Sequence, residues 1–154
     1  MADPAPGFVA NADHRARLVR LFASSTIAQS MGITLSYDDE ERAHFEMPYT
    51  GRYDHFLDDV HGGAIATLVD NAGWFAAAAK HPTWIVSVEF QVRYLAPAGR
   101  EPLTAIGTVL RAGKRITQAE MRVTNRSGIL VATGSGSFAV TSSPLPDPAQ
   151  RPAR

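Results

Sequence analysis

The chain has 154 residues, of which 45% are hydrophobic, and its 15 lysines and arginines balance its 15 aspartates and glutamates. This length suits one domain, and the neutral balance argues against a general nucleic-acid-binding protein, which usually carries a basic excess. The lack of cysteine excludes disulfides and thiolate chemistry. No apolar run reaches the roughly 18 residues of a membrane-spanning helix, and the first residues do not resemble a signal peptide. We therefore expect a soluble, cytoplasmic protein with neither a membrane nor a nucleic acid as partner.

The first third of the chain predicts a flexible start, one helix and two strands. Residues 1–12 are rich in alanine, proline and glycine and are expected to be flexible. Apolar residues then recur at helical spacing from Asp13, a candidate N-cap, to about Ser30. A strand follows over 33–37, and the alternation of apolar with polar side chains predicts another over 43–47.

The rest of the chain predicts a long helix over 61–81 and four strands. These strands are expected at 84–95, 103–111, 116–124 and 129–140. The short turns between them imply antiparallel neighbours. The order of elements predicts an α+β domain, in which about six antiparallel strands bury one face against the long helix. Residues 141–154 are proline-rich and are expected to be disordered.

The long helix carries a carboxylate, Asp70, in the middle of an otherwise apolar sequence. At about 100° per residue, one face holds apolar residues that are expected to contact the sheet: Ile65, Leu68, Ala72, Phe75, Ala76 and Ala79. Asp70 points the opposite way, within a stripe of mostly small residues: Gly63, Ala66, Thr67, Gly73, Trp74 and Ala77. A solvent-facing stripe normally has long polar side chains, whereas small ones let a ligand or a partner subunit approach. An ionised carboxylate in such a recess needs hydrogen bonds, and Asn71 or Thr67 can supply them.

Two glycines, Gly62 and Gly63, begin this helix. A helix N-terminus presents unpaired N–H groups and a partial positive charge, and glycine leaves those groups sterically open. An oxygen that bears negative charge can dock there. The helix thus offers an oxyanion site at its start and a carboxylate two turns later. The same residues also fit a structural role, as a tight helix entry and a satisfied pair at a subunit interface.

Three segments resemble the hotdog-fold acyl-CoA thioesterases of the phenylacetate-degradation (PaaI-like) type. They are HGGAIATLVDNAG at 61–73, VSVEFQVRYLAPA at 86–98 and ILVATGSGSF at 129–138. The resemblance implies a hotdog domain over 13–140, whose sheet wraps around the central helix. It also implies hydrolysis of an aryl- or medium-chain acyl-CoA to the free acid and CoA, with no cofactor and no metal.

The resemblance implies roles for individual residues. Asp70 matches the family's helix carboxylate, which acts as general base on water or as nucleophile on the thioester carbonyl. The backbone N–H of Gly62 matches the oxyanion donor, and His61 lines the site. Ser87 matches a serine that helps to hold the water. Because the alternation places Ser87 on the polar side of its strand, it is expected to reach Asp70 only across a subunit boundary.

One position departs from the family pattern. Related enzymes often carry an asparagine six residues before the motif histidine, and here that position is His55. Its imidazole N–H can donate to the thioester oxygen in the same way, or it can be misaligned. His55 and His61 flank Asp58 and Asp59, but this spacing matches no standard zinc pattern.

The remaining candidate residues are assigned to substrate binding. Near the motif they are His61, Gly63, Asn71 and Trp74. For the CoA phosphates, the cationic hairpin Arg111, Lys114 and Arg115 is a candidate, although hairpin tips are often charged. Tyr53 and Phe56 are further candidates for an acyl pocket, or else core or interface aromatics.

Two other functions and the assembly state stay open at this stage. A hotdog hydratase or dehydratase acts on similar thioesters, and the replacement at His55 favours a non-catalytic acyl-CoA-binding module. Family active sites lie at a dimer interface. A six-stranded sheet around one helix also leaves an edge and its outer face uncovered, so we expect a homodimer and, as in many such folds, a homotetramer.

Overall fold

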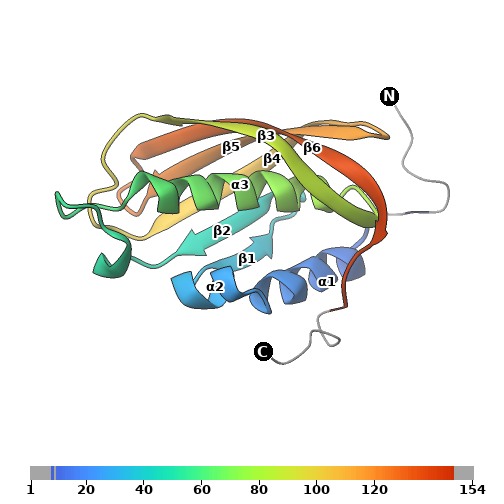
Figure 1. Cartoon of the computed structure of the whole chain (residues 1–154), viewed down its shortest axis with the longest axis horizontal. Coiled ribbons are helices and arrows are strands. Elements are labelled where there is room, and N and C mark those ends of the chain that lie inside the picture. The colour runs from blue at the N-terminus through green and yellow to red at the C-terminus, as the bar shows by residue number, and fades with distance from the viewer. Residues whose placement is uncertain (1–7, 9, 148–154) are drawn as a thin grey trace.

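A six-stranded antiparallel sheet curls around one long helix in the computed structural model of the chain, which describes residues 8 and 10–147 (Figure 1). The helices are α1 (Ala12–Ala23), α2 (Thr26–Met31) and α3 (Gly62–Ala78), with a short 3-10 helix, η1, at Gly51–Tyr53. The strands are β1 (Thr34–Tyr37), β2 (Ala43–Met47), β3 (Thr83–Tyr94), β4 (Leu103–Ala112), β5 (Ile116–Asn125) and β6 (Leu130–Pro144). Their order across the sheet is β1-β2-β4-β5-β6-β3, so β1 and β3 form the two edges. The predicted α+β architecture is confirmed.

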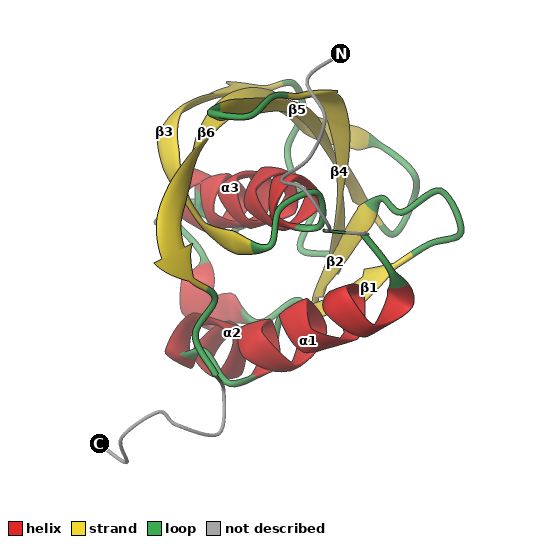
Figure 2. Cartoon of the chain, turned by 90° about the vertical axis from the view of Figure 1, so that its right-hand side faces the viewer, coloured by secondary structure: helices red, strands yellow, loops and turns green. Residues whose placement is uncertain are grey.

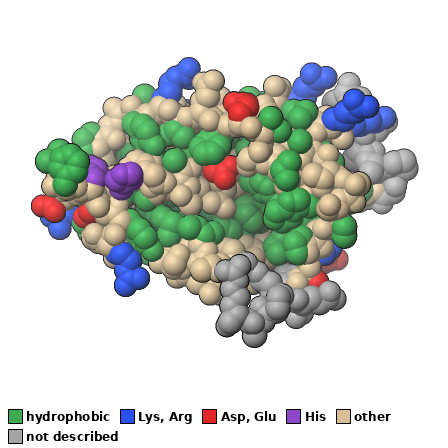
Figure 3. Space-filling view, in the orientation of Figure 1, with side chains coloured by type: hydrophobic (Ala, Val, Ile, Leu, Met, Phe, Trp, Pro, Cys, Tyr) green, Lys and Arg blue, Asp and Glu red, His purple; other side chains and the backbone are tan. Residues whose placement is uncertain are grey.

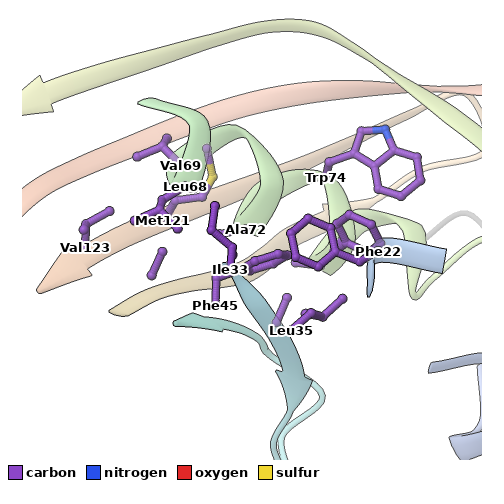
Figure 4. Close-up of a cluster of buried hydrophobic side chains, with 14 of the residues drawn as sticks. Phe22, Ile33, Leu35, Phe45, Leu68, Val69, Ala72, Trp74, Met121 and Val123 are labelled. Carbon is purple, nitrogen blue, oxygen red and sulfur yellow. The ribbon is translucent and has the colours of Figure 1, made fainter. Parts of the chain in front are cut away.

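The sheet surrounds α3 on most sides, and α1 and α2 lie beyond its open side (Figure 2). All six apolar residues predicted to face the sheet are buried. Leu68, Val69 and Ala72 of α3 lie among the side chains of β2 and β5 in the core (Figure 4). Among the described residues, no helix is both long and apolar enough to span a membrane.

The small stripe around Asp70 is open only in part. Gly73, Trp74 and Ala77 are buried, contrary to the prediction that this stripe is accessible to a partner. A Cβ at Gly73 would lie 2.7 Å from the ring of Phe138 and 2.8 Å from the sulfur of Met121. Glycine at this position therefore lets α3 approach β5 and β6, so this part of the stripe is explained by core contacts.

The N-terminal region forms two helices instead of the single one predicted over 13–30. The N-cap of α1 is Asn11 and not Asp13, because the Asn11 side chain accepts a hydrogen bond from the His14 N–H at 2.9 Å. Ser25 separates the helices and caps α2 by accepting from the Ala28 N–H. The predicted flexible segment 1–12 therefore ends earlier, since α1 already begins at residue 12.

The C-terminal segment also differs from its prediction. Strand β6 continues to Pro144, and Leu145 is only 4% exposed. The guanidinium of Arg17 donates to the carbonyl of Leu145 at 2.7 Å. Disorder over 141–154 is thus wrong for 141–147, because one apolar side chain anchors the segment in the core. The rest of that segment, 148–154, and residues 1–7 and 9 of the predicted flexible start lie outside the described residues.

Strand β3 contains an irregularity that decides where its side chains point. Its pairing with β6 shifts after Ser87 and leaves Val88 as a bulged residue. Ser87 lies opposite Phe138, and Tyr94, beyond the bulge, lies opposite Ala132. Directly opposed residues share a face of the sheet, and both β6 residues are fully buried. Ser87 and Tyr94 therefore both face α3, although an unbroken strand would turn them to opposite faces.

The approach of α3 to β4 provides a test of the fold. A Cβ at Gly107 would lie 2.0 Å from the carbonyl oxygen of Ala72, which is helix backbone and cannot rotate away. We expect Gly107→Ala to lower the free energy of unfolding by about 3 kcal/mol, the upper end of ordinary overpacking, as measured by urea denaturation. Gly51→Ala is the control, since its Cβ would meet neighbours only at 3.6 Å or beyond. Equal midpoints for both variants would contradict the expectation.

Candidate active site

Asp70 lies in the middle of α3, and its carboxylate has a partner in the same chain. The hydroxyl of Ser87 donates to Oδ1 of Asp70 at 2.8 Å. The prediction that Ser87 reaches Asp70 only across a subunit boundary is therefore wrong, and the bulge at Val88 is the physical reason. The carboxylate accepts no other hydrogen bond within the described residues. Its second oxygen is thus available to a water or a substrate.

The neighbours that the sequence suggested for Asp70 bond elsewhere. The amide of Asn71 donates to the carbonyl of Thr67 at 2.8 Å, and the hydroxyl of Thr67 donates to the carbonyl of Gly63 at 2.9 Å. Both bonds run one helical turn back along α3. Asn71 and Thr67 therefore satisfy the helix backbone instead of the carboxylate.

Asp70 and Ser87 line a cavity of about 460 Å³. Its walls come from α1, α2, α3, the beginning of β3 and residues 146–147 after β6, and they are mainly apolar. Four aromatic side chains contribute to them: Phe22, Trp74, Phe75 and Trp84. The Trp74 indole N–H donates to the carbonyl of Ile85 at 3.0 Å, so its polar atom is satisfied. The cavity therefore combines a largely apolar, aromatic wall with polar side chains, among them the Asp70 carboxylate and the Ser87 hydroxyl.

The beginning of α3 offers one unpaired donor. His61 is the N-cap, and its Nδ1 accepts from the Gly63 N–H at 2.8 Å. The His61 carbonyl accepts from the Ala64 N–H at 2.9 Å. Within the described residues, the Gly62 N–H donates to no acceptor. The first turn thus keeps the Gly62 N–H available, whereas the N–H of Gly63 is already used.

Strand β3 also contacts this end of the helix through a residue that sequence reasoning missed. The hydroxyl of Tyr94 donates to the carbonyl of Gly62 at 2.7 Å. A Cβ at Gly62 would lie 3.2 Å from the Tyr94 ring. In the sequence, Tyr94 reads as one more apolar position of its strand. Tyr94 carries a hydroxyl among these apolar positions, and this polar group was the one sign in the sequence that it makes a hydrogen bond.

The loop before α3 carries His55 and forms a second cavity of about 450 Å³ together with Gly62 and Tyr94. The Nδ1 of His55 accepts from the Leu57 N–H at 3.0 Å. A neutral ring with Nδ1 as acceptor holds its proton on Nε2, so His55 has an N–H to donate. His55 and Gly62 line the same cavity, and the role of His55 as a second donor stays a prediction.

Asp59 holds this loop in place. Burial raises the pKa of its carboxyl, but backbone N–H groups, including those of Val60 and Arg100, outweigh burial and hold the pKa below its ordinary value. The carboxylate therefore ties the loop to the segment that follows β3. No cluster of three or more metal-ligating side chains occurs among the residues that the structure describes.

The Asp70 carboxylate and the Gly62 N–H, the candidate oxyanion donor, are too far apart to act on one carbonyl within a single chain. Gly62 and Asp70 are eight residues apart on α3, which separates them by about 12 Å along the helix axis. They also line different cavities. A single chain therefore does not bring these two candidate groups together.

The other predicted contacts lie away from both of these groups. Arg111, Lys114 and Arg115 surround the β4–β5 turn, at the end of the molecule opposite Gly62 (Figure 1). The hydroxyl of Tyr53 donates to the carbonyl of Ser30, and Phe56 is 93% exposed. Neither aromatic residue lines the cavity beside Asp70.

Comparison with known proteins finds relatives that are described as thioesterases. A sequence model described as the Thioesterase superfamily matches residues 57–132. Acyl-coenzyme A thioesterase 13 of Mus musculus is 30% identical over 105 residues, which cover 66% of this chain and 75% of that protein.

Solved structures show the same fold. A thioesterase family protein from Silicibacter pomeroyi is 25% identical, with a TM-score of 0.75 over 81% of this chain and 96% of that one. The E. coli PaaI protein from the phenylacetic acid degradation operon is 21% identical, with a TM-score of 0.78 over 88% of this chain and 100% of that one. The predicted hotdog fold is therefore confirmed.

The cap at His61 can be tested by stability. His61→Ala removes the acceptor of the Gly63 N–H, and we expect it to lower the free energy of unfolding by about 1 kcal/mol. His61→Asn retains a side-chain acceptor and serves as the matched control, expected to unfold close to wild type. Denaturant unfolding measures both. If the two variants unfold together, the cap does not stabilise the helix.

Proposed function

The chain belongs to the thioesterase superfamily, and from this premise we propose that it hydrolyses acyl-CoA thioesters to the free acid and CoA. The observation that carries the proposal is the Asp70–Ser87 pair on the wall of an apolar cavity. The serine hydroxyl occupies one carboxylate oxygen and fixes the orientation of the other. A carboxylate held in this way can take a proton from a water molecule, or attack a carbonyl itself.

We propose that a homodimer completes the site, with Gly62 of one copy beside Asp70 of the other. This arrangement solves the separation of about 12 Å between the two groups along a single helix. The edge strand β3 supports it, because it pairs on one side only and exposes apolar side chains, including Val86, Val88 and Phe90. Hydrophobic side chains also gather on the face of the molecule that carries α3 and β3 (Figure 3).

The homotetramer stays a prediction, and the outer face of the sheet offers no support for it. The outward side chains of the central strand β5 include Gln118, Glu120 and Arg122, and all three are exposed. A polar face of this kind is stable in water and gives a second sheet little apolar area to bury.

In the proposed reaction, the thioester oxygen accepts a hydrogen bond from the Gly62 N–H, with the Nε2–H of His55 as second donor. Asp70 removes a proton from water as the water oxygen attacks the carbonyl carbon. The tetrahedral intermediate then expels the CoA thiolate, Asp70 returns its proton to the thiolate or to solvent, and the acid leaves. A thiolate is a good leaving group, so no strong general acid is needed.

The cavity beside Asp70 supports an acyl group that is aromatic or of medium length. Its volume of about 460 Å³ and its aromatic walls suit an apolar group that packs against Trp74 and Trp84. The rings of these two tryptophans lie 4.8 Å apart, centre to centre, so they contact each other and form one continuous aromatic wall. For the CoA phosphates, we propose the cationic hairpin at Arg111, Lys114 and Arg115, whose charges suit anionic groups.

Asp70→Asn tests the carboxylate, because it keeps the size and shape of the side chain. We expect thiol release from a panel of acyl-CoAs to fall about 100- to 10,000-fold, the usual contribution of a general base. Asp13→Asn, on the exposed side of α1, is the matched control and is expected to retain activity.

The possible outcomes separate the competing functions. Equal activity of Asp70→Asn and wild type would make Asp70 structural and refute the mechanism. CoA binding without thiol release from any substrate would favour a binding module. Hydration of crotonyl-CoA without thiol release would favour a hydratase.

Gly62→Pro tests the oxyanion donor and the shared site together. Proline at the first position of a helix removes the N–H, and the preceding residue, His61, has φ −62° and ψ 137°, which proline accepts. We expect a loss of about 100- to 1,000-fold in thiol release relative to Gly62→Ala, which adds the same Cβ 3.2 Å from the Tyr94 ring but keeps the N–H.

Mixing Gly62→Pro with Asp70→Asn then distinguishes a shared site from a site within one chain. A mixed dimer contains one intact site, formed by the wild-type Asp70 of one copy and the wild-type Gly62 of the other. After subunit exchange we expect about a quarter of wild-type activity, because about half of the dimers are mixed. Failure to recover activity, despite exchange shown by differential tags, would refute the shared site.

A further inference from the structure

We infer that Tyr94 is a positioning residue that holds the oxyanion donor, the Gly62 N–H, in line for the thioester carbonyl. The inference rests on the proposed function and deepens it. Its basis is the hydrogen bond from the Tyr94 hydroxyl to the Gly62 carbonyl at 2.7 Å, together with the contact between the ring and the Gly62 backbone.

The peptide unit between Gly62 and Gly63 is held at both of its polar atoms. Its carbonyl oxygen accepts from Tyr94, and its N–H donates to Nδ1 of His61. Two side chains from different elements, one before α3 and one on β3, therefore fix the plane of this peptide. The Gly62 N–H, which precedes that plane by one residue, remains without an acceptor in the described part of the chain.

A double glycine needs such external support. Glycine has no Cβ to restrict its backbone, so two in succession leave the first turn of a helix with unusual freedom. An oxyanion donor contributes most when its direction is set before the reaction, because no reorganisation is then required. The glycines keep the N–H accessible, and Tyr94 and His61 supply the rigidity that glycine lacks.

Strand β3 connects this support to the carboxylate. The bulge at Val88 turns both Ser87 and Tyr94 towards α3, so one strand orients Asp70 and Gly62 at the two ends of the same stretch of helix. In the proposed dimer these two groups serve different active sites. Each copy of β3 therefore contributes to both.

Tyr94 is 54% exposed, which allows a substitution that leaves the core intact. Tyr94→Phe removes only the hydroxyl. We expect kcat for thiol release to fall about tenfold, a part of the loss that follows complete removal of a donor, while KM stays near that of wild type.

The matched control is Tyr37→Phe. The Tyr37 hydroxyl donates to the carbonyl of Phe75 at 2.9 Å, so the same substitution removes the same type of bond from the other end of α3. We expect this variant to retain the wild-type kcat under conditions in which it is folded. A similar fall in kcat for both variants would show a general effect of anchoring α3 and would overturn the inference.

A pair of unreactive CoA analogues separates donor positioning from structural support. One is a trifluoromethyl ketone, which is hydrated in water and so resembles the tetrahedral intermediate, and the other is a thioether without a carbonyl. Tyr94→Phe should weaken binding of the ketone about tenfold and leave thioether binding unchanged, because only the ketone meets the donor. Equal effects on the two analogues would overturn the inference.

The failure of this inference can be told from the failure of the proposed function. If wild type releases no thiol from any acyl-CoA, the proposed function is wrong. If wild type is active and Gly62→Pro is not, but Tyr94→Phe matches wild type in kcat and in ketone binding, only the role of Tyr94 is refuted.

Discussion

The short distance between α3 and the sheet is the constraint on which the rest of the molecule depends. The carbonyl of Ala72 occupies the place of a side chain at Gly107, and a Cβ at Gly134 would lie 2.5 Å from the Val69 side chain. These small residues set how deeply the helix lies. At that depth, the side chains of Ser87 and Tyr94 span the gap between β3 and α3. The geometry of the candidate site is thus a consequence of core contacts.

Much of the fold could be predicted from the sequence, because periodicity reports burial directly. The apolar face of α3 predicts a helix with one buried side, and the alternation in β2 predicts a strand with one buried face. The bulge in β3 has no such signal. Val86, Val88 and Phe90 are all apolar, so the row reads as one unbroken alternation even though its register shifts. At the C-terminus, a proline-rich composition concealed the effect of one buried leucine, Leu145.

The parts of the candidate site that lie on one helix could be predicted from the sequence. The contacts between the helix and a strand could not. Gly62 and Asp70 share one helix, so their spacing follows from counting residues. The hydrogen-bond partner of Asp70 cannot be found by counting residues. The choice between Asn71 and Ser87 depends on the register of β3 and on competition from the carbonyl groups of the helix backbone. Asn71 bonds to the carbonyl four residues before it, as helical polar residues often do. Ser87 was named from the family resemblance but was expected to act across a subunit boundary, and Tyr94 escaped notice, because both contacts depend on the register of β3.

The bulge at Val88 also shapes how this chain can change over evolutionary time. Substitutions along β3 exchange one side chain for another and leave the directions of all the others as they are. Loss of the single bulged residue restores a regular strand, and one half of β3 must then turn its inward side chains to the solvent. A deletion of one codon therefore removes the contact to Asp70 or the contact to Gly62 in a single event, without altering either residue. Among descendants of such a chain, those that keep both contacts differ from those that have lost one in the length of β3. The identities of the residues in β3 distinguish them less sharply.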